Sequence, residues 1–445
     1  MRQAIILAGG KGTRLAERLH GLPKPLVQIA RQPLLQRQLL LLKEQGITRV
    51  LLLVNHQAEA IAAFCRAHNN FDLDITLVDD GEPRGTAGAT LAALSQLPED
   101  ADDLLILYGD TLFNIDLNRL FAFHDRHDGA ATLFLHPNDH PQDSDLVELD
   151  AGGRIRAVHP YPHPEDTEFS NLVNAALYVV RRSALLPWAH LAQETPRVID
   201  FAKELFPRMV AAGLPLYGYS SPEYIKDVGT PSRLDRAEAD IASGRYASGS
   251  LAIPKAAVFL DRDGVINYEV GFLNRREDFT LLPGAAKALR CLNQSGILSV
   301  VVTNQPVLAR GECSEEQLAA IHARMDTLLG QEGAYVDRLY YCPHHPDKGY
   351  QGERPELKIE CACRKPHIGM LERAKCDLHI DYARSWLVGD RTSDIQAAQN
   401  AGIRSVLVRT GAGGTDARYS AKPDFVADDL EMAVKLILGS SSSVA

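Results

Sequence analysis

Two stretches of sequence decide the expected fold: Leu7-Ala-Gly-Gly-Lys-Gly-Thr-Arg-Leu15 and Phe259-Leu-Asp-Arg-Asp-Gly-Val-Ile266. Each stretch continues a short apolar run, residues 4–7 or 256–260, and such a run predicts a strand buried in a parallel sheet. Open α/β sheets bind ligands at the carboxyl ends of their strands. The glycines and charged residues at these two ends suit phosphate groups, so we expect two α/β units with separate phosphate sites.

The length and composition also favour two domains. A chain of 445 residues, 45% hydrophobic and 23% charged, is ordinary for a folded protein but too long for one typical domain. Apolar runs alternate with helical patterns in both halves, which predicts the α/β class with two wound sheets. The expected strands include residues 50–54, 75–78, 104–107, 132–135, 175–180, 298–303, 385–388 and 405–408. The expected helices include residues 34–44, 58–68 and 315–329.

The residues after 240 indicate a domain boundary. Residues 241–253 are mostly small and turn-forming, and a new apolar run begins soon after them. We therefore predict a first domain of residues 1–240, a linker of residues 241–253 and a second domain of residues 254–438. The last residues, 439–445, are mostly serine and are predicted to form a disordered tail.

The charge and the apolar pattern exclude several classes of partner. The net charge is −10, and no basic block offers a site for nucleic acid or for an anionic membrane. No apolar stretch approaches the roughly 20 residues needed to cross a bilayer, and the first residues enter a strand rather than a signal peptide. We therefore expect a cytoplasmic protein that binds small molecules, with neither nucleic acid nor membrane as a partner.

The first stretch is suited to a nucleoside triphosphate. Glycines let backbone N–H groups approach a polyphosphate, and basic side chains add charge-assisted hydrogen bonds. The dinucleotide pattern G-x-G-x-x-G is absent, which disfavours hydride transfer. The expected nucleotide-binding residues of this loop are Gly9, Gly10, Lys11, Gly12 and Thr13, with Arg14 beside them. Lys24 lies between two prolines that restrict its backbone and aim its ammonium group; a surface lysine in a turn is the alternative.

Two carboxylates follow strands in the first half. Asp110 ends an apolar strand, and Asp227 lies in Tyr224-Ile-Lys-Asp227. At neighbouring strand ends they can hold Mg²⁺, which keeps some of its waters and bridges phosphate oxygens. Taken singly, each is more often a turn or cap residue. Their combination with Arg14 and Lys24 favours a catalytic site.

Residues 1 to about 240 resemble the nucleotidyltransferases that act on sugar 1-phosphates, through the motifs LAGGKGTRL, PKPL, EPRGTAGA, YGD and KDVGTP. The resemblance implies a Rossmann-like domain in which the sugar 1-phosphate attacks the α-phosphorus of a nucleoside triphosphate and pyrophosphate leaves. Arg14 would then neutralise the leaving charge and Lys24 would bind the reacting phosphates. Asp110 and Asp227 would hold Mg²⁺. The backbone at Gly85 and Thr86 would meet the base, and Asp80 or Glu82 would accept hydrogen bonds from guanine.

The expected sugar contacts of this half are incomplete. Where the family carries Glu-Lys-Pro, this chain has Val158-His-Pro160, so a lysine that contacts the sugar phosphate is missing. Asn171 and Asn174 remain candidate ligands of sugar hydroxyl groups. The alternative for each is an amide that hydrogen-bonds to the backbone.

The second stretch is suited to phosphate removal. Asp261 follows an apolar strand and can attack phosphorus to form an aspartyl-phosphate, while Asp263 can protonate the leaving oxygen and later activate water. Together with later motifs, this stretch resembles the haloacid dehalogenase phosphatases over residues 256 to about 430. The resemblance implies a substrate-binding set of Thr303, Asn304, Arg364 and Lys365. It implies a Mg²⁺ site of Asp261, Asp263, Asp390 and Asp394.

Three of the seven cysteines lie close together in the second half. Cys342, Cys361 and Cys363 with His344 would make a closed tetrahedral Zn²⁺ site, which is typical of a structural metal in a reducing compartment. His345 is the alternative imidazole, and unliganded thiols are the alternative to a metal site. This insert resembles that of the heptose 1,7-bisphosphate phosphatases and the related histidinol phosphatases.

The two resemblances imply consecutive reactions. The second half would remove the 7-phosphate of D-glycero-D-manno-heptose 1,7-bisphosphate, and the first half would couple the heptose 1-phosphate to a nucleotide from GTP. Sugar phosphates and the nucleoside triphosphate are the expected partners, and a homo-oligomer is left open. One alternative is a different sugar with UTP or dTTP, joined to a phosphatase for histidinol phosphate. Another is that one half is an inactive regulatory module.

Overall fold

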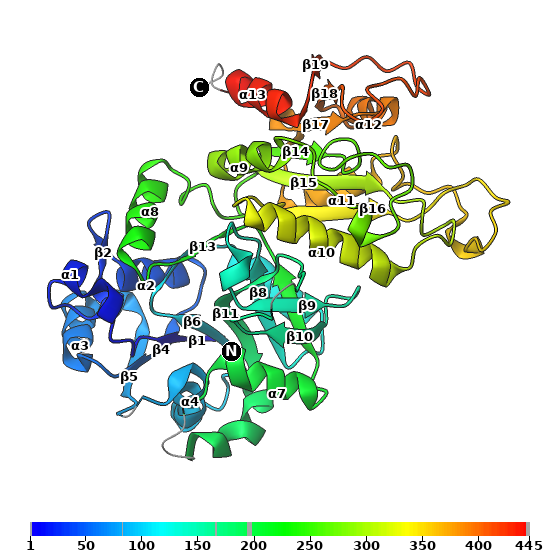
Figure 1. Ribbon diagram of the computed structural model, residues 1–445. Coiled ribbons are helices and arrows are strands. Elements are labelled where there is room, and N and C mark those ends of the chain that lie inside the picture. The colour runs from blue at the N-terminus through cyan, green and yellow to red at the C-terminus, as the bar shows by residue number, and fades with distance from the viewer. Residues whose placement is uncertain (1, 82, 165–166, 194–197, 442–445) are drawn as a thin grey trace. The chain divides into compact units, whose positions relative to one another are not determined.

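The protein, as a computed structural model, divides into two compact units (Figure 1). The structure describes residues 2–81, 83–164, 167–193 and 198–441. Unit 1 consists of Met1–His136, Asp145–Tyr161 and Leu172–Ser250, and unit 2 consists of Pro137–Ser144, Pro162–Asn171 and Leu251–Ala445. The division after Ser250 falls inside the expected linker. The first 240 residues are not one uninterrupted domain, however, because two short segments of them belong to unit 2.

The main sheet of unit 1 is mixed. Its strand order is β10-β9-β11-β6-β1-β4-β5, with β8 pairing β11 and β12 pairing β8. The strands β1, β4, β5 and β6 run parallel, whereas β11 is antiparallel to β6. Their bounds are β1 Gln3–Leu7, β4 Arg49–Val54, β5 Asp74–Asp79, β6 Asp103–Tyr108, β8 Ala131–His136, β9 Leu146–Leu149, β10 Ile155–His159, β11 Val173–Arg181 and β12 Leu216–Ser220.

Helices cover both faces of this sheet because successive side chains of each buried strand point to opposite faces. In β1, Ala4 and Ile6 pack into one core and Ile5 into the other. Helices α2, α3 and α5 cover the first face, and α4 and α7 cover the second. Their bounds are α2 Leu34–Glu44, α3 Ala58–Ala67, α4 Gly85–Ala93, α5 Leu117–Asp125 and α7 Phe206–Ala211.

Smaller elements complete unit 1 beside the carboxyl end of β6. Strand β7 pairs antiparallel with β13, and the register sets Asp227 opposite Thr111. Helix α8 follows β13, so residues 241–242 of the expected linker are helical. The bounds of these smaller elements are α1 Ala16–Leu19, β2 Gln28–Ile29, β3 Gln32–Pro33, β7 Thr111–Asn114, α6 Arg182–Leu185, β13 Tyr224–Asp227 and α8 Pro231–Ala242.

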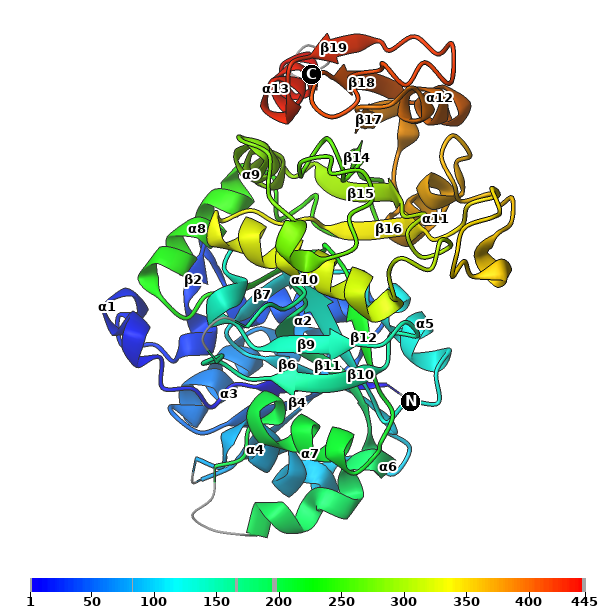
Figure 2. The same cartoon turned by 45° about the vertical axis from the view of Figure 1, so that its right-hand side comes forward.

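Unit 2 contains a six-stranded parallel sheet in the order β16-β15-β14-β17-β18-β19. The strand order reverses around β14, which is the kind of switch point where such sheets bind ligands. Helices α9, α10 and α13 pack on one face, and α11 and α12 pack on the other. Figure 2 shows α10 beside β15 and β16. The bounds are β14 Ala257–Leu260, α9 Ala285–Ser295, β15 Leu298–Asn304, α10 Glu315–Gln331, β16 Arg338–Cys342, α11 Gly369–Leu378, β17 Trp386–Gly389, α12 Thr392–Ala401, β18 Arg404–Val408, β19 Phe425–Ala427 and α13 Leu430–Ser441.

The α/β class with two wound sheets is confirmed, and the differences lie at the edges and the end. The strands β9, β10 and β12 of unit 1 and the edge strands β16 and β19 of unit 2 are absent from the expected set. Helix α13 continues to Ser441, so residues 439–441 are helical rather than part of a disordered tail. Residues 442–445 of that predicted tail lie outside the described residues. In the described part of the chain, no helix has the length and apolar composition to cross a membrane.

Candidate functional sites

A cavity of about 530 Å³ opens at the carboxyl ends of the parallel strands of unit 1. The predicted residues that line it are Gly9, Gly10, Lys11, Lys24, Asp80, Gly85, Thr86 and Asp110. Gly85 has a φ of +77°, and a Cβ there would lie 2.5 Å from the carbonyl oxygen of Ile199, so only glycine fits. Gly12 and Thr13 are not among the lining residues. Gly12 instead packs against Lys24, where an added Cβ would lie 3.0 Å from the lysine Cβ.

The predicted charged residues of unit 1 converge around Gly229. An added Cβ at Gly229 would lie 3.3 Å from Nζ of Lys24 and 3.4 Å from Nη2 of Arg14. Lys24 also forms an ion pair with Asp110. The main-chain oxygen of Asp110 accepts a hydrogen bond of 3.0 Å from Val228 N, next to Asp227. Residues from four separate segments therefore meet around Lys24 and Asp110, which line the cavity.

The two carboxylates of this cluster each have a basic partner in the structure. Asp110 faces the Lys24 ammonium group, and Asp227 forms an ion pair with Arg233, so each carboxylate already attracts a positive charge. Asp227 also accepts a hydrogen bond from Gly229 N. Carboxylate oxygens are the ligands that Mg²⁺ prefers, and one or two of them suffice when phosphates complete the shell.

Sequence reasoning missed Asn55, which lines the same cavity. Its Nδ2 donates to Oδ1 of Asp80 at 2.8 Å and to the carbonyl oxygen of Gly81 at 2.6 Å. Burial raises the pKa of Asp80, and the bond from Asn55 opposes this shift. Asn55 directly follows the apolar strand β4, and that position was the signal that could have found it. Glu82, the other expected base contact, lies outside the described residues.

The side chain of Thr86 is also held in place. Its Oγ1 donates to Oδ2 of Asp200 at 2.8 Å and accepts a bond of 3.1 Å from Phe201 N. Asp200 caps the following helical turn, because its Oδ1 accepts bonds from Ala202 N and Lys203 N. Asp200 therefore fixes the start of α4, which carries Gly85 and Thr86.

The two asparagines predicted to bind the sugar have backbone partners. Asn171 belongs to unit 2, where its Oδ1 accepts from Asn138 N at 3.1 Å and its Nδ2 donates to Asn138 O at 2.7 Å. The sugar-ligand prediction for Asn171 therefore gives way to the backbone alternative. Asn174 lies in β11, where its Oδ1 accepts from Ala176 N at 3.2 Å. Its role as a sugar ligand stays a prediction.

A second cavity, of about 560 Å³, lies at the carboxyl ends of β14 and β15 in unit 2. All six predicted residues Asp261, Asp263, Thr303, Asn304, Arg364 and Lys365 line it. The buried Nζ of Lys365 lies 3.0 Å from Oδ1 of Asp261 and 2.7 Å from Oδ1 of Asp394. The amide of Asn304 exchanges two hydrogen bonds, of 3.2 and 3.0 Å, with the main chain of Lys365. Asn304 therefore positions Lys365.

Three buried carboxylates of unit 2 are grouped as metal ligands would be. Single oxygens of Asp261, Asp390 and Asp394 all lie within 4.8 Å of one another. Burial raises the pKa of Asp261 to about 6 and that of Asp390 to about 8, and the neighbouring carboxylates add to both shifts. Oδ1 of Asp390 is buried and has no hydrogen-bond partner among the described residues. A divalent cation would relieve this crowding of negative charge, so the residues fit Mg²⁺.

The carboxylate of Asp263 is not part of this group, which differs from the predicted ligand set. It accepts hydrogen bonds from Arg262 Nη2 at 2.8 and 2.9 Å, from Asn267 Nδ2 at 2.9 Å and from Gln305 Nε2 at 2.9 Å. Burial alone would raise the pKa of Asp263, but the charge of Arg262 and these bonds outweigh burial and lower it. Gln305, which also donates to Oγ1 of Thr303 at 2.9 Å, is a site residue that the sequence analysis missed.

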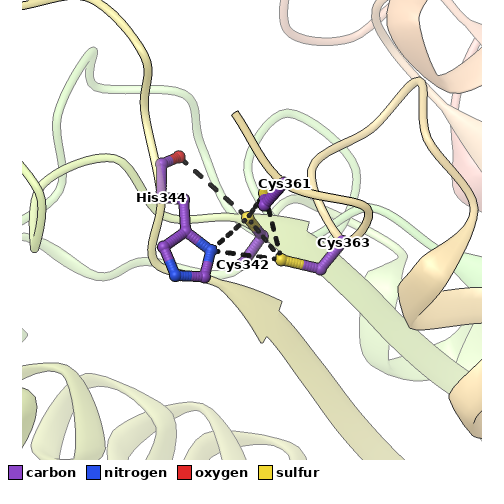
Figure 3. Close-up of side chains that lie close together, drawn as sticks. All are labelled: Cys342, His344, Cys361 and Cys363. Carbon is purple, nitrogen blue, oxygen red and sulfur yellow. Dashed lines mark hydrogen bonds between the residues drawn. The ribbon is translucent and has the colours of Figure 1, made fainter. Parts of the chain in front are cut away.

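Figure 3 shows the sulfur atoms of Cys342, Cys361 and Cys363 gathered around Nδ1 of His344. The three sulfur–sulfur distances are 3.1, 3.3 and 3.6 Å, and Nδ1 lies 3.3 and 3.8 Å from two of the sulfur atoms. Hydrogen bonding from Cys342 lowers the pKa of Cys363 to about 5, towards the thiolate that binds metals. His345 is outside the group. The donor set suits a structural Zn²⁺ ion.

The N-terminal half matches the family model described as nucleotidyl transferase over residues 3–244, and residues 362–433 match the model described as HAD-hydrolase-like. Curated relatives match the second half. The D-glycero-beta-D-manno-heptose-1,7-bisphosphate 7-phosphatase of Haemophilus ducreyi is 44% identical over 178 residues, covering 40% of this chain and 94% of that protein. The enzyme of the same name from Escherichia coli K12 is 43% identical over 183 residues, covering 40% and 93%.

Solved structures resemble each half. One is the D,D-heptose 1,7-bisphosphate phosphatase of B. bronchiseptica complexed with magnesium and phosphate, which is 36% identical, covers 42% of this chain and 99% of that chain, and has a TM-score of 0.37. Another is HddC from Yersinia pseudotuberculosis, which is 22% identical, covers 54% and 100%, and has a TM-score of 0.46. The two enzyme classes expected from the sequence are confirmed by the family model and the curated relatives. The chain belongs to the nucleotidyl transferase family through its first half and to the family of the heptose bisphosphate 7-phosphatases through its second.

Proposed function

We propose that this chain catalyses two consecutive steps in the synthesis of a nucleotide-activated heptose. Unit 2 hydrolyses the 7-phosphate of D-glycero-D-manno-heptose 1,7-bisphosphate, and unit 1 transfers a nucleotidyl group from GTP to the resulting heptose 1-phosphate. The observation that carries the proposal is the identity of 43–44% to heptose bisphosphate 7-phosphatases over nearly their whole length. The cavity that holds Asp261, Lys365 and Asp263 supports it.

In unit 2, Asp261 is the proposed nucleophile. Its carboxylate attacks the phosphorus of the 7-phosphate, the bond from phosphorus to the sugar oxygen breaks, and an aspartyl-phosphate forms. Asp263 in its protonated form gives a proton to the leaving oxygen. The resulting carboxylate, which the charge of Arg262 stabilises, then takes a proton from the water that hydrolyses the aspartyl-phosphate. Lys365 neutralises the transferred phosphoryl group, and Thr303 donates its hydroxyl to it. Mg²⁺, held by Asp261, Asp390 and Asp394, would supply further positive charge to the phosphoryl oxygens.

In unit 1, an oxygen of heptose 1-phosphate attacks the α-phosphorus of GTP and pyrophosphate leaves. Lys24 binds the reacting phosphates and Arg14 stabilises the charge that develops on pyrophosphate. The backbone of the loop at Gly9 and Gly10 holds the triphosphate. Asp110 and Asp227 would hold Mg²⁺, which would supply positive charge to the phosphate groups. Asp80 is the proposed acceptor for guanine, since a carboxylate pairs with the two N–H groups on that base edge.

The proposal also includes a structural metal ion in unit 2 and a location in the cytoplasm. A Zn²⁺ ion held by the three cysteines and His344 is structural, because four protein ligands leave no open position. The ion would fix the loop that carries Arg364 and Lys365. The reduced thiols of this site and the nucleotide substrate agree with a cytoplasmic enzyme.

The experiment that tests the proposal uses the purified protein with Mg²⁺, each anomer of heptose 1,7-bisphosphate and each nucleoside triphosphate. Phosphate, pyrophosphate and nucleotide sugar are measured separately. We expect phosphate release from one anomer and GDP-heptose when GTP is present. Phosphate release without any nucleotide sugar would contradict the assignment of unit 1, and the absence of phosphate release would contradict that of unit 2.

A further inference from the structure

Gln305 is a buried residue of the unit 2 cavity whose side chain contacts two groups of the proposed phosphatase site. It is 2% exposed, and its Nε2 lies 2.9 Å from Oδ2 of Asp263 and 2.9 Å from Oγ1 of Thr303. An amide nitrogen carries two N–H donors, so one donor serves each contact. Gln305 therefore joins the acid–base residue to the hydroxyl group that meets the transferred phosphoryl group.

The partners fix the orientation of this amide and of the hydroxyl group. The carboxylate of Asp263, which Arg262 also binds, only accepts hydrogen bonds, so the side-chain atom of Gln305 that faces it is the nitrogen. The second N–H of that nitrogen makes Oγ1 of Thr303 an acceptor. The hydroxyl hydrogen of Thr303 has no acceptor among the described residues. It is therefore available to an oxygen of the phosphoryl group.

The main chain holds Gln305 between two strands. Gln305 directly follows β15, in which Thr303 pairs with Tyr341 and Asn304 pairs with Cys342 of β16. The main-chain N of Gln305 donates to the carbonyl oxygen of Cys342 at 2.8 Å. A side chain that starts from a paired strand and makes two hydrogen bonds of its own has little freedom to rotate. The amide of Gln305 is therefore a rigid link between its two partners.

We propose that Gln305 is a positioning residue for the phosphatase reaction: it turns the hydroxyl group of Thr303 towards the phosphoryl group and holds the carboxyl group of Asp263 at the leaving oxygen. The inference rests on the proposed phosphatase function and deepens it, because it assigns a residue that acts through two others and not on the substrate. The attacking and leaving oxygens of phosphoryl transfer lie roughly in line, so these groups must stay in a fixed arrangement. A misplacement of about 1 Å costs up to about 100-fold in rate.

The test uses p-nitrophenyl phosphate, because its leaving group departs without protonation and kcat/KM reports only the steps up to the aspartyl-phosphate. Gln305→Met keeps the side-chain length and removes both N–H donors, and we expect it to lower kcat/KM by roughly 10-fold. In a Thr303→Val background the same change should alter kcat/KM by less than about threefold, because the hydroxyl group that it orients is already absent. Gln331→Met, the same substitution at an exposed residue outside the cavity, is the control.

Gln305→Glu separates the effect of hydrogen bonding from that of volume. The two side chains have nearly the same size, but a glutamate carboxylate accepts hydrogen bonds, so it draws the hydroxyl group of Thr303 to itself and repels Asp263. We expect a larger loss of kcat/KM than in Gln305→Met. The loss should be greater with heptose 1,7-bisphosphate than with p-nitrophenyl phosphate, because the sugar oxygen needs the proton from Asp263. Urea denaturation measures the folding of each variant, and Gln305→Glu decides the question if Gln305→Met does not fold.

Either of two results would overturn the inference. One is an equal fractional loss of kcat/KM from Gln305→Met with and without the hydroxyl group of Thr303. The other is a kcat/KM within about twofold of the wild type in both Gln305 variants. A wild-type protein that hydrolyses p-nitrophenyl phosphate but not heptose 1,7-bisphosphate would refute the sugar assignment alone, and the comparison with p-nitrophenyl phosphate would still decide the role of Gln305. Hydrolysis of neither compound would refute both proposals.

Discussion

The Nε2 atom of His322 lies 3.2 Å from Nη1 of Arg262, whose residue is 0% exposed. The other nitrogen atoms of this guanidinium group bind the carboxylate of Asp263. His322 therefore acts behind the proposed acid–base residue as a neutral acceptor for a buried cation. A buried donor that loses its acceptor costs about 1–3 kcal/mol, and more when it is charged.

We predict that His322→Phe destabilises unit 2 by about 1–3 kcal/mol and lowers kcat, because Arg262 loses a partner. His322→Gln can still accept a hydrogen bond and should recover part of both losses. Urea denaturation and phosphatase kinetics measure the two effects. A glutamine variant as defective as the phenylalanine variant would show that volume, and not the hydrogen bond, is what His322 supplies.

The same histidine makes stability depend on pH. Burial and the charge of Arg262 lower the pKa of His322 to about 3, from an ordinary value of 6.5. Between these values the unfolded chain binds a proton that the folded chain does not, so stability falls as the pH falls below 6.5. The loss is at most about 1.4 kcal/mol per pH unit. Unfolding measured at pH 7 and pH 5 should show a smaller pH effect in His322→Gln than in the wild type.

If the cysteine cluster holds the proposed Zn²⁺ ion, its removal should affect only unit 2. We expect Cys361→Ser, or treatment with a zinc chelator, to lower the Tm of unit 2 by roughly 10 °C and to abolish phosphate release. Pyrophosphate release by unit 1 should persist. Metal analysis should find about one zinc per chain. Cys376→Ser changes an exposed thiol outside the cluster and serves as the control; an equal loss of zinc in that variant would contradict the assignment.

Gly85→Ala should damage unit 1 through a steric clash. The new Cβ would lie 2.5 Å from the carbonyl oxygen of Ile199, at a φ of +77° that alanine disfavours. We expect a cost of about 1–3 kcal/mol and a higher KM for the nucleotide. Gly213→Ala is the matched control, because its φ is +80° and nothing lies within 4 Å of the added atom. If Gly85→Ala and Gly213→Ala lower the stability equally, the whole cost comes from the backbone conformation and none from the clash with Ile199.

The two active sites should fail independently. Asp261→Asn is expected to lower the rate of phosphate release by about 10³-fold or more. Pyrophosphate release from GTP and supplied heptose 1-phosphate should continue. Asp110→Asn should do the reverse. Each variant is the control of the other. A variant that loses neither activity would remove the corresponding residue from its proposed role.

Much of the fold and many residues of both sites could be predicted because buried parallel strands have apolar runs in their sequence. The polar residue that follows such a run lies at the edge where ligands bind, and this rule found Asp110, Asp261 and Asp390. It would also have found Asn55. The spacing of the cysteines indicated the metal cluster, in which the sulfur atoms of Cys342 and Cys361 lie 3.6 Å apart.

Other features depend on packing between segments that are distant in sequence. No local pattern shows that the side-chain amide of Asn171 hydrogen-bonds to the backbone of Asn138. The same holds for the approach of Arg14 and Lys24 to Gly229 and for the antiparallel direction of β11. Two short segments of the first half join unit 2, which a division by composition cannot reveal.

The sequence by itself determined the two α/β sheets, the loops at their strand ends and the residue types for phosphate and metal chemistry, because these follow from short-range hydrophobic pattern and spacing. The tertiary structure alone decided which charges are compensated. Arg391 has Glu269 as a partner, whereas Arg364 and Arg418 line the same cavity and form no ion pair with a described residue. Charge compensation depends on distances of a few ångströms between distant segments, and only the folded chain sets those distances.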